Sequence, residues 1–122
     1  MIKSFLNLFR NGMSDKITPI SALEAKKRLD EGWKPFIIDV RLPKEVEICK
    51  LASMDLNCPH TELQKVIAQI PKDRDLLVYC KMGGRGNMAC CTLVEHGFTN
   101  IYDLKGGIIG WANDVDKSLE QY

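Results

Sequence analysis

The chain has 122 residues, and its 17 basic and 16 acidic side chains leave a formal net charge of +1. This length suits one ordinary domain with a single core, and the balanced charge gives no support for binding to nucleic acid or to an acidic membrane surface. No apolar run approaches the roughly 20 residues that span a bilayer. Five cysteines without a Cys-x-x-Cys pair suggest neither zinc nor a dithiol switch. We therefore expect a reducing compartment, the cytoplasm.

Residues 1–13 stand apart from the rest of the chain. Before Gly12, four apolar residues fall at helical spacing: Ile2, Phe5, Leu6 and Phe9. The apolar run is too broken for a secretory signal. A helix that packs or docks on a partner is the plain interpretation, whereas weak contact with a membrane surface and a segment without fixed structure are the alternatives. We expect the folded domain to occupy residues 14–122.

Strand and helix patterns alternate along this domain. Ser21, with Glu24 three residues later, predicts the start of the first helix, and Gly32 predicts its end. The predicted strands are 16–17, 36–40, 53–57, 76–79 and 101–104, and the predicted helices are 22–31, 45–48, 60–70, 87–96 and 108–112. Such alternation predicts an α/β domain with a central, mostly parallel sheet and helices on both faces.

Cys80 follows the apolar run that begins at Leu76, and a glycine-rich bend and a helical segment come after it. The cysteine is therefore expected at the carboxyl end of a buried strand, the edge of an open α/β sheet where ligands bind. The alternative is that Cys80 is one more small buried apolar residue, which is the usual fate of a free cysteine. The composition of the bend favours the functional interpretation.

The bend contains glycines and cations. Glycine reaches positive φ without a Cβ clash, so the main chain can curl and turn successive N–H groups toward an anion. Lys81 and Arg85 add positive charge, and the N-terminus of the following helix adds its dipole. Such surroundings favour the ionised, nucleophilic form of a thiol. The glycines concerned are Gly83, Gly84 and Gly86.

The segment Cys80-Lys81-Met82-Gly83-Gly84-Arg85 resembles the active loop Cys-x-x-Gly-x-Arg of rhodanese-like sulfurtransferases, in particular the domains attached to adenylyltransferases of molybdopterin and thiolation pathways. Three further stretches resemble marker elements of the same family. They are Phe36-Ile37-Ile38-Asp39-Val40-Arg41, Glu45-Val46-Glu47-Ile48-Cys49-Lys50-Leu51 and Leu104-Lys105-Gly106-Gly107-Ile108-Ile109-Gly110-Trp111. The resemblance spans about residues 16–113 and implies a single rhodanese-like domain.

The resemblance also implies an activity. Cys80 would be the catalytic nucleophile that carries a persulfide, and the loop residues Lys81, Met82, Gly83, Gly84, Arg85 and Gly86 would bind the substrate. Sulfur would come from thiosulfate or another persulfide and pass to a thiol, cyanide or a sulfur-carrier protein, with an adenylyltransferase as a further partner. We expect no cofactor and no metal. The alternative is a domain of the same fold that only docks partners.

Three polar residues outside the loop are expected to support it. Asp39 and Arg41 follow the strand at 36–40, and we interpret them as a hydrogen-bond network in which Glu45 is the partner of Arg41. Cys49 and Cys58 could relay sulfur or form a disulfide with Cys80, with ordinary burial as the alternative.

A tyrosine phosphatase is the alternative enzyme class, because it also uses a cysteine and an arginine around an anion. Phosphatase loops place five residues between cysteine and arginine, whereas Lys81 through Gly84 are four. The shorter loop predicts a smaller anion pocket, which suits a sulfur atom carried on Cys80 better than a phosphoryl group. Gly86 departs from the rhodanese pattern, because most members have Ser or Thr after the loop arginine.

Overall fold

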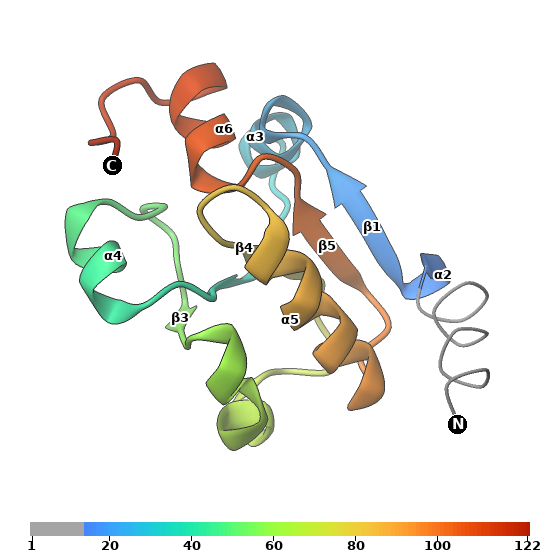
Figure 1. Cartoon of the computed structure of the whole chain (residues 1–122). Helices are drawn as coiled ribbons and strands as arrows, with labels where there is room; N and C mark the ends of the chain where they lie inside the picture. The colour runs from blue at the N-terminus through green and yellow to red at the C-terminus, as the bar shows by residue number, and fades with distance from the viewer. Residues whose placement is uncertain (1–13) are drawn as a thin grey trace.

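The computed structural model describes residues 14–122. The helix expected within residues 1–13 lies outside the described residues. Strands and helices alternate along the chain, as the sequence predicts, and Figure 1 shows their arrangement. The elements are α2 (Ser14–Lys16), β1 (Ile17–Ile20), α3 (Ala22–Asp30), β2 (Phe36–Asp39), α4 (Pro43–Ile48), β3 (Leu56–Asn57), η2 (His60–Gln69), β4 (Leu76–Tyr79), α5 (Gly84–Glu95), β5 (Ile101–Leu104) and α6 (Gly107–Asp114).

The five strands form one parallel sheet in the order β1-β5-β4-β2-β3. The central strand is β4, and all four of its residues are buried, which is why its sequence is a continuous apolar run. Because the strands are parallel, their carboxyl ends meet at one edge. This edge gathers the segments that follow β2, β3, β4 and β5.

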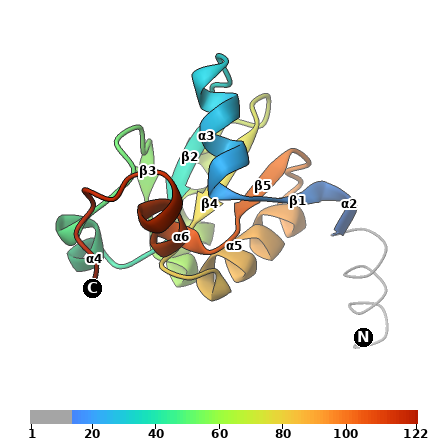
Figure 2. The same cartoon turned by 90° about the horizontal axis from the view of Figure 1, so that it is seen from above.

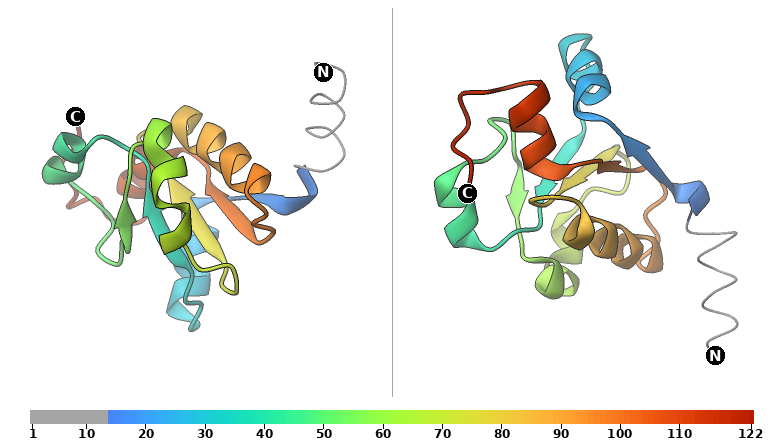
Figure 3. Two further views of the ribbon diagram at one scale, coloured as in Figure 1. Left: turned by 90° about the horizontal axis from the view of Figure 1, so that it is seen from below. Right: turned by 45° about the horizontal axis from the view of Figure 1, so that its top comes forward.

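Helices cover both faces of the sheet. α5 and η2 pack on one face, where the buried cluster includes Ile38, Val78 and Leu93. α3 and α6 pack on the other face with Leu77 and Trp111. The view from above places α3 and α6 in front of the sheet (Figure 2), and the view from below places η2 and α5 in front of it (Figure 3). The predicted three-layer α/β architecture is confirmed.

Local signals placed several element ends correctly. The Ser21 hydroxyl accepts a hydrogen bond from the Glu24 N–H at 3.1 Å, so α3 begins where the cap predicts. Gly32 and Gly97 follow their helices with φ of +103° and +91°, the left-handed conformation that ends a helix.

The first strand spans Ile17–Ile20 instead of residues 16–17, because Lys16 belongs to α2. Two helices differ most from their predictions. The segment after Pro59 is a 3-10 helix, in which residues three apart eclipse, so the pairs Leu63/Val66 and Ile67/Ile70 still face the core. The helix after the loop begins at Gly84 instead of Asn87, because the bend is completed by Gly83.

Within residues 14–122, no helix combines the length and the apolar character that crossing a membrane requires. The same part of the chain holds no group of three or more His, Cys, Asp or Glu side chains that could bind a metal ion.

Candidate active site

Cys80 lies directly after β4, at the carboxyl edge of the sheet, and only 1% of its surface is exposed. Its Sγ accepts a hydrogen bond from the Gly83 N–H over 3.0 Å. Gly83 has a φ of +134°, a conformation that side chains with a Cβ rarely adopt. The bend therefore directs the Gly83 N–H at the sulfur of Cys80. Glycine is required at position 83 because of this positive φ.

The other two loop glycines have a different role from the one the sequence suggested. Gly84 and Gly86 lie in the first turn of α5, and neither has a positive φ. A Cβ built on Gly86 would lie 3.5 Å from the Sγ of Cys80 and 3.4 Å from the Oδ1 of Asp103. Because Gly86 has no side chain, the first turn of α5 can lie close to the Cys80 sulfur. Gly86 is not needed to bend the main chain.

The N-terminus of α6 docks on the loop from the opposite face. Ile108 N–H donates to the Cys80 carbonyl over 2.9 Å, and Ile109 N–H donates to the Lys81 carbonyl over 3.1 Å. Gly107 has a φ of +58° and lies so close that a Cβ there would be only 2.6 Å from the Cys80 carbonyl oxygen. The paired glycines at 106–107 were noted in the sequence, but their contact with the loop was not predicted.

Arg85 forms a two-pronged ion pair with Glu45. Its Nη1 and Nη2 donate to the two carboxylate oxygens over 2.6 and 3.0 Å. The Leu42 N–H also donates to Glu45. The hydrogen bonds from Arg85 lower the pKa of Glu45 to about 2, against the opposing effect of burial. The carboxylate of Glu45 is therefore the partner of Arg85 and not of Arg41, which reaches only the main-chain carbonyl of Glu45.

Arg41 instead forms a completely buried ion pair with Asp39. Its other donors reach the carbonyl oxygens of Cys49, at 2.7 Å, and Glu45, at 3.4 Å. Burial opposes the charge of Arg41, but hydrogen bonds to Asp39 and Tyr122 raise its pKa above the ordinary value. The network connects the end of β2 to the end of α4, the helix that carries Glu45.

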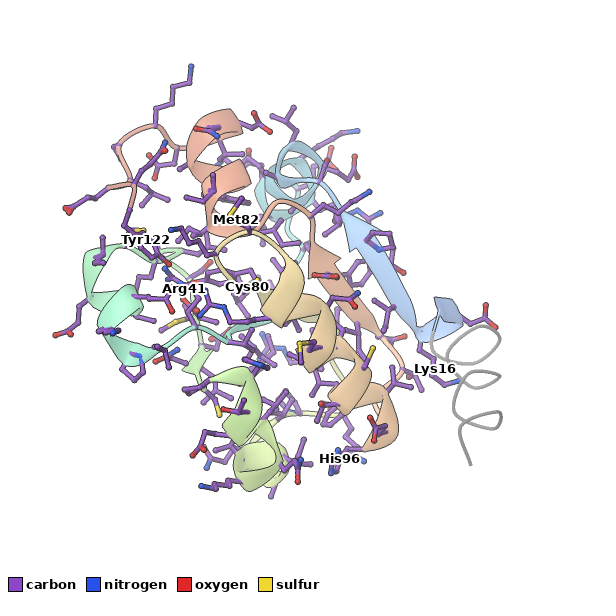
Figure 4. All side chains as sticks on the ribbon, viewed as in Figure 1. Lys16, Arg41, Cys80, Met82, His96 and Tyr122 are labelled. Carbon is purple, nitrogen blue, oxygen red and sulfur yellow. The ribbon has the colours of Figure 1, made fainter. Side chains whose placement is uncertain are left out.

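Lys81 and Met82 lie at the rim of the loop. The Met82 side chain points outward, and 70% of the residue is exposed. The Nζ of Lys81 lies 4.2 Å from the ring centroid of Tyr122, whose hydroxyl contacts Arg41 and Glu45. Figure 4 shows Cys80 inside the bend, Met82 at its outer end, and Arg41 and Tyr122 on the side of α4. Sequence reasoning missed Tyr122, which is far from every motif.

The remaining cysteines have different surroundings. All five thiols are free, and burial raises the pKa of Cys58, Cys90 and Cys91. Cys90 packs in the core beneath α5. Cys49 is half-buried beside the other core cluster. A relay of sulfur through Cys49 or Cys58 stays a prediction, whereas a disulfide with Cys80 is not present.

Comparison of the sequence with known proteins identifies the family of this chain. The model of the rhodanese-like domain matches residues 21–114. A protein of Allochromatium vinosum named sulfurtransferase is 31% identical over 96 residues, which cover 79% of this chain and 89% of that protein. A probable adenylyltransferase/sulfurtransferase MoeZ of Mycobacterium tuberculosis is 32% identical over 109 residues. That match covers 88% of this chain but only 28% of the relative.

Solved structures agree with the sequence comparison. A rhodanese-related protein of Thermoplasma volcanium superposes with a TM-score of 0.72 at 28% identity, covering 80% of this chain and 93% of that one. A rhodanese-like domain protein of Staphylococcus aureus superposes with a TM-score of 0.73 at 23% identity, with 86% and 98% of the two chains covered, and supports the fold alone. The loop around Cys80 thus stands on a scaffold shared with these proteins, and the chain belongs to the rhodanese-like domain family.

Proposed function

We propose that this protein is a sulfurtransferase that carries a persulfide on Cys80. The observation that carries the proposal is the position of the sulfur, which lies at the carboxyl end of β4 and accepts the Gly83 N–H over 3.0 Å. Preorganised main-chain donors of this kind stabilise developing negative charge without reorganisation. The 31% identity to a protein named sulfurtransferase supports the same activity.

The reaction proceeds in two displacements. The Cys80 thiolate attacks the outer sulfur of thiosulfate, the sulfur–sulfur bond breaks, and sulfite leaves with the bonding electron pair. The terminal sulfur of the new persulfide carries the negative charge, beside the bend that directs the Gly83 N–H to the Cys80 sulfur. A nucleophile such as cyanide or a thiolate then attacks that sulfur, and Cys80 leaves as the thiolate. Another persulfide can replace thiosulfate as donor, with its thiolate as the leaving group.

The charge arrangement supports a small anionic donor. Glu45 neutralises Arg85, so the cation left at the rim is Lys81, for which no ion pair is found among residues 14–122. A single ammonium draws an anion toward the loop. We assign thiosulfate binding to Lys81 and to the main chain of the bend, and we assign Arg85 to the support of the loop through Glu45.

The larger acceptor is a sulfur-carrier protein in this proposal. Relatives named adenylyltransferase/sulfurtransferase support it, although this chain spans only about a quarter of their length. The exposed Met82 at the rim supplies an adaptable apolar contact, which suits a protein tail or an organic thiol. The resemblance to domains of molybdopterin-pathway adenylyltransferases makes molybdopterin synthesis the pathway that we propose for such a transfer. Five free cysteines suit the reducing cytoplasm.

Intact-mass measurement after thiosulfate treatment tests the proposal. We expect the protein to gain one sulfur atom, peptide mapping to place it on Cys80, and cyanide to remove it as thiocyanate. Cys80→Ser abolishes both steps. Cys91→Ser, at a partly exposed cysteine of α5 outside the loop, retains them.

The alternative is a rhodanese-fold interaction module without catalysis. It predicts no added sulfur on wild-type protein from thiosulfate or from a low-molecular-weight persulfide, and no thiocyanate above the level of Cys80→Ser. Added sulfur on Cys49 or Cys58 with Cys80 unmodified would contradict the assignment of the nucleophile.

A further inference from the structure

Residues 115–122 return from α6 across the carboxyl edge of the sheet to α4, on the side of the active loop (Figures 1 and 4). This segment is packed. Val115 and Leu119 contact the apolar cluster under α6, and the Gln121 side chain donates to Asn113 over 3.1 Å. The segment therefore has a defined path, and that path ends with Tyr122 beside the loop.

Tyr122 makes contacts through both its hydroxyl group and its aromatic ring. Its hydroxyl donates to Glu45 over 2.7 Å and accepts from Arg41 over 2.8 Å. Its ring lies 4.2 Å from the Nζ of Lys81 and 5.8 Å from the Cζ of Arg41. One side chain thus connects the buried Arg41 network, the carboxylate that holds Arg85, and the cation of the rim.

Lys81 needs such a partner in order to act at a fixed place. A lysine side chain has a flexible stem of four carbons, and fixing it costs about 2 kcal/mol of side-chain conformational entropy. The ring of Tyr122 covers one side of the Lys81 ammonium. The other N–H donors of that ammonium stay available to an anion. Contact with the ring therefore concentrates positive charge beside the Cys80 loop instead of leaving it distributed in solvent.

We propose that Tyr122 is a positioning residue of the site, whose ring holds the Lys81 ammonium at the mouth of the loop and whose hydroxyl completes the support of the Glu45–Arg85 pair. The inference rests on the proposed sulfur transfer for its kinetic consequence. Tyr122 itself touches neither substrate nor sulfur. It determines how well an anionic donor is captured.

The test is steady-state kinetics with thiosulfate and cyanide on variants of Tyr122. Tyr122→Leu keeps apolar bulk but loses the ring, and we expect the KM for thiosulfate to rise about two- to five-fold, the ratio expected from one exposed cation–π contact, with a smaller change in kcat. Tyr122→Phe keeps the ring and raises KM less. Ser118→Ala, in the same segment, is the matched control and leaves KM unchanged, because the exposed Ser118 hydroxyl contacts only Asp116.

A double-mutant cycle identifies the route of the effect. If the ring acts through Lys81, Tyr122→Leu and Tyr122→Phe have the same KM in a Lys81→Ala background, because both lack the hydroxyl and they differ only in the ring. An equal rise from Tyr122→Phe to Tyr122→Leu in both backgrounds overturns the inference, and so does a fall in KM in Tyr122→Leu, which would mean that the segment covers the site. Thermal unfolding of each variant separates these effects from loss of fold.

A readout that needs no sulfur transfer separates this inference from the proposed function. In NMR spectra, the methylene protons next to the Lys81 ammonium should be shifted by the ring current in wild type and in Tyr122→Phe, and the shift should vanish in Tyr122→Leu. Wild-type protein without transferase activity but with this pattern would refute the proposed function alone. Active protein without it would refute the positioning role alone.

Discussion

Replacing Gly107, at the start of α6, with alanine should push the loop that carries Cys80 out of its position. Gly107 has a φ of +58°, and its Cβ would meet the main-chain carbonyls of both Lys81 and Cys80, the second at 2.6 Å. Neither neighbour is a side chain that could swing away. Relief requires α6 and the loop to separate, and separation breaks the hydrogen bonds that Ile108 and Ile109 donate to those carbonyls.

The cost follows from these contacts. A residue with a Cβ at positive φ costs about 1 kcal/mol, and each of the two displaced hydrogen bonds contributes about 1 kcal/mol. We expect Gly107→Ala to lower the free energy of unfolding by about 3 kcal/mol, measured by urea titration of the far-ultraviolet circular dichroism. Sulfur transfer should fall even where the variant is still folded, because the main chain that carries Cys80 has moved.

Gly110 in the same helix is the matched control. A Cβ there would lie 3.4 Å from the Lys105 carbonyl, at ordinary contact distance, and alanine is favoured over glycine inside a helix by about 0.5–1 kcal/mol. Gly110→Ala should therefore be neutral or slightly stabilising. Equal stability of Gly107→Ala and wild type, or equal losses in the two variants, would refute the contact argument.

Two further predictions concern the rim and its support. The pKa of Glu45, lowered to about 2 from its ordinary 4.5, means that its carboxylate stabilises the fold above pH 4.5 and that up to about 3 kcal/mol is lost as the pH falls toward 2. Urea titrations at pH 6 and pH 3 should show a smaller pH dependence in Glu45→Gln, and equal dependence contradicts this. Met82→Asp should reduce transfer to a protein or thiol acceptor more than transfer to cyanide, and equal reductions would mean that the rim does not select acceptors.

Local sequence signals predicted much of the fold. The apolar run from Leu76 is a central strand because residues buried on both faces of a sheet must all be apolar. Ser21 begins a helix and Gly32 ends one because caps act within a few residues. The start of α5 was predicted three residues late, because Gly84 and Gly86 were assigned to the bend that Gly83 completes alone.

The amino-acid sequence by itself determined the α/β alternation and the place of Cys80 after a buried strand, since both follow from neighbours along the chain. Only the tertiary structure decided which charges pair. Glu45 is closer in sequence to Arg41 than to Arg85, yet its carboxylate meets Arg85, because the helix directions fix the distances between side chains. Tyr122 reaches Lys81 for the same reason. Ion pairs and ring contacts depend on separation in space, which periodicity and motif spacing do not encode.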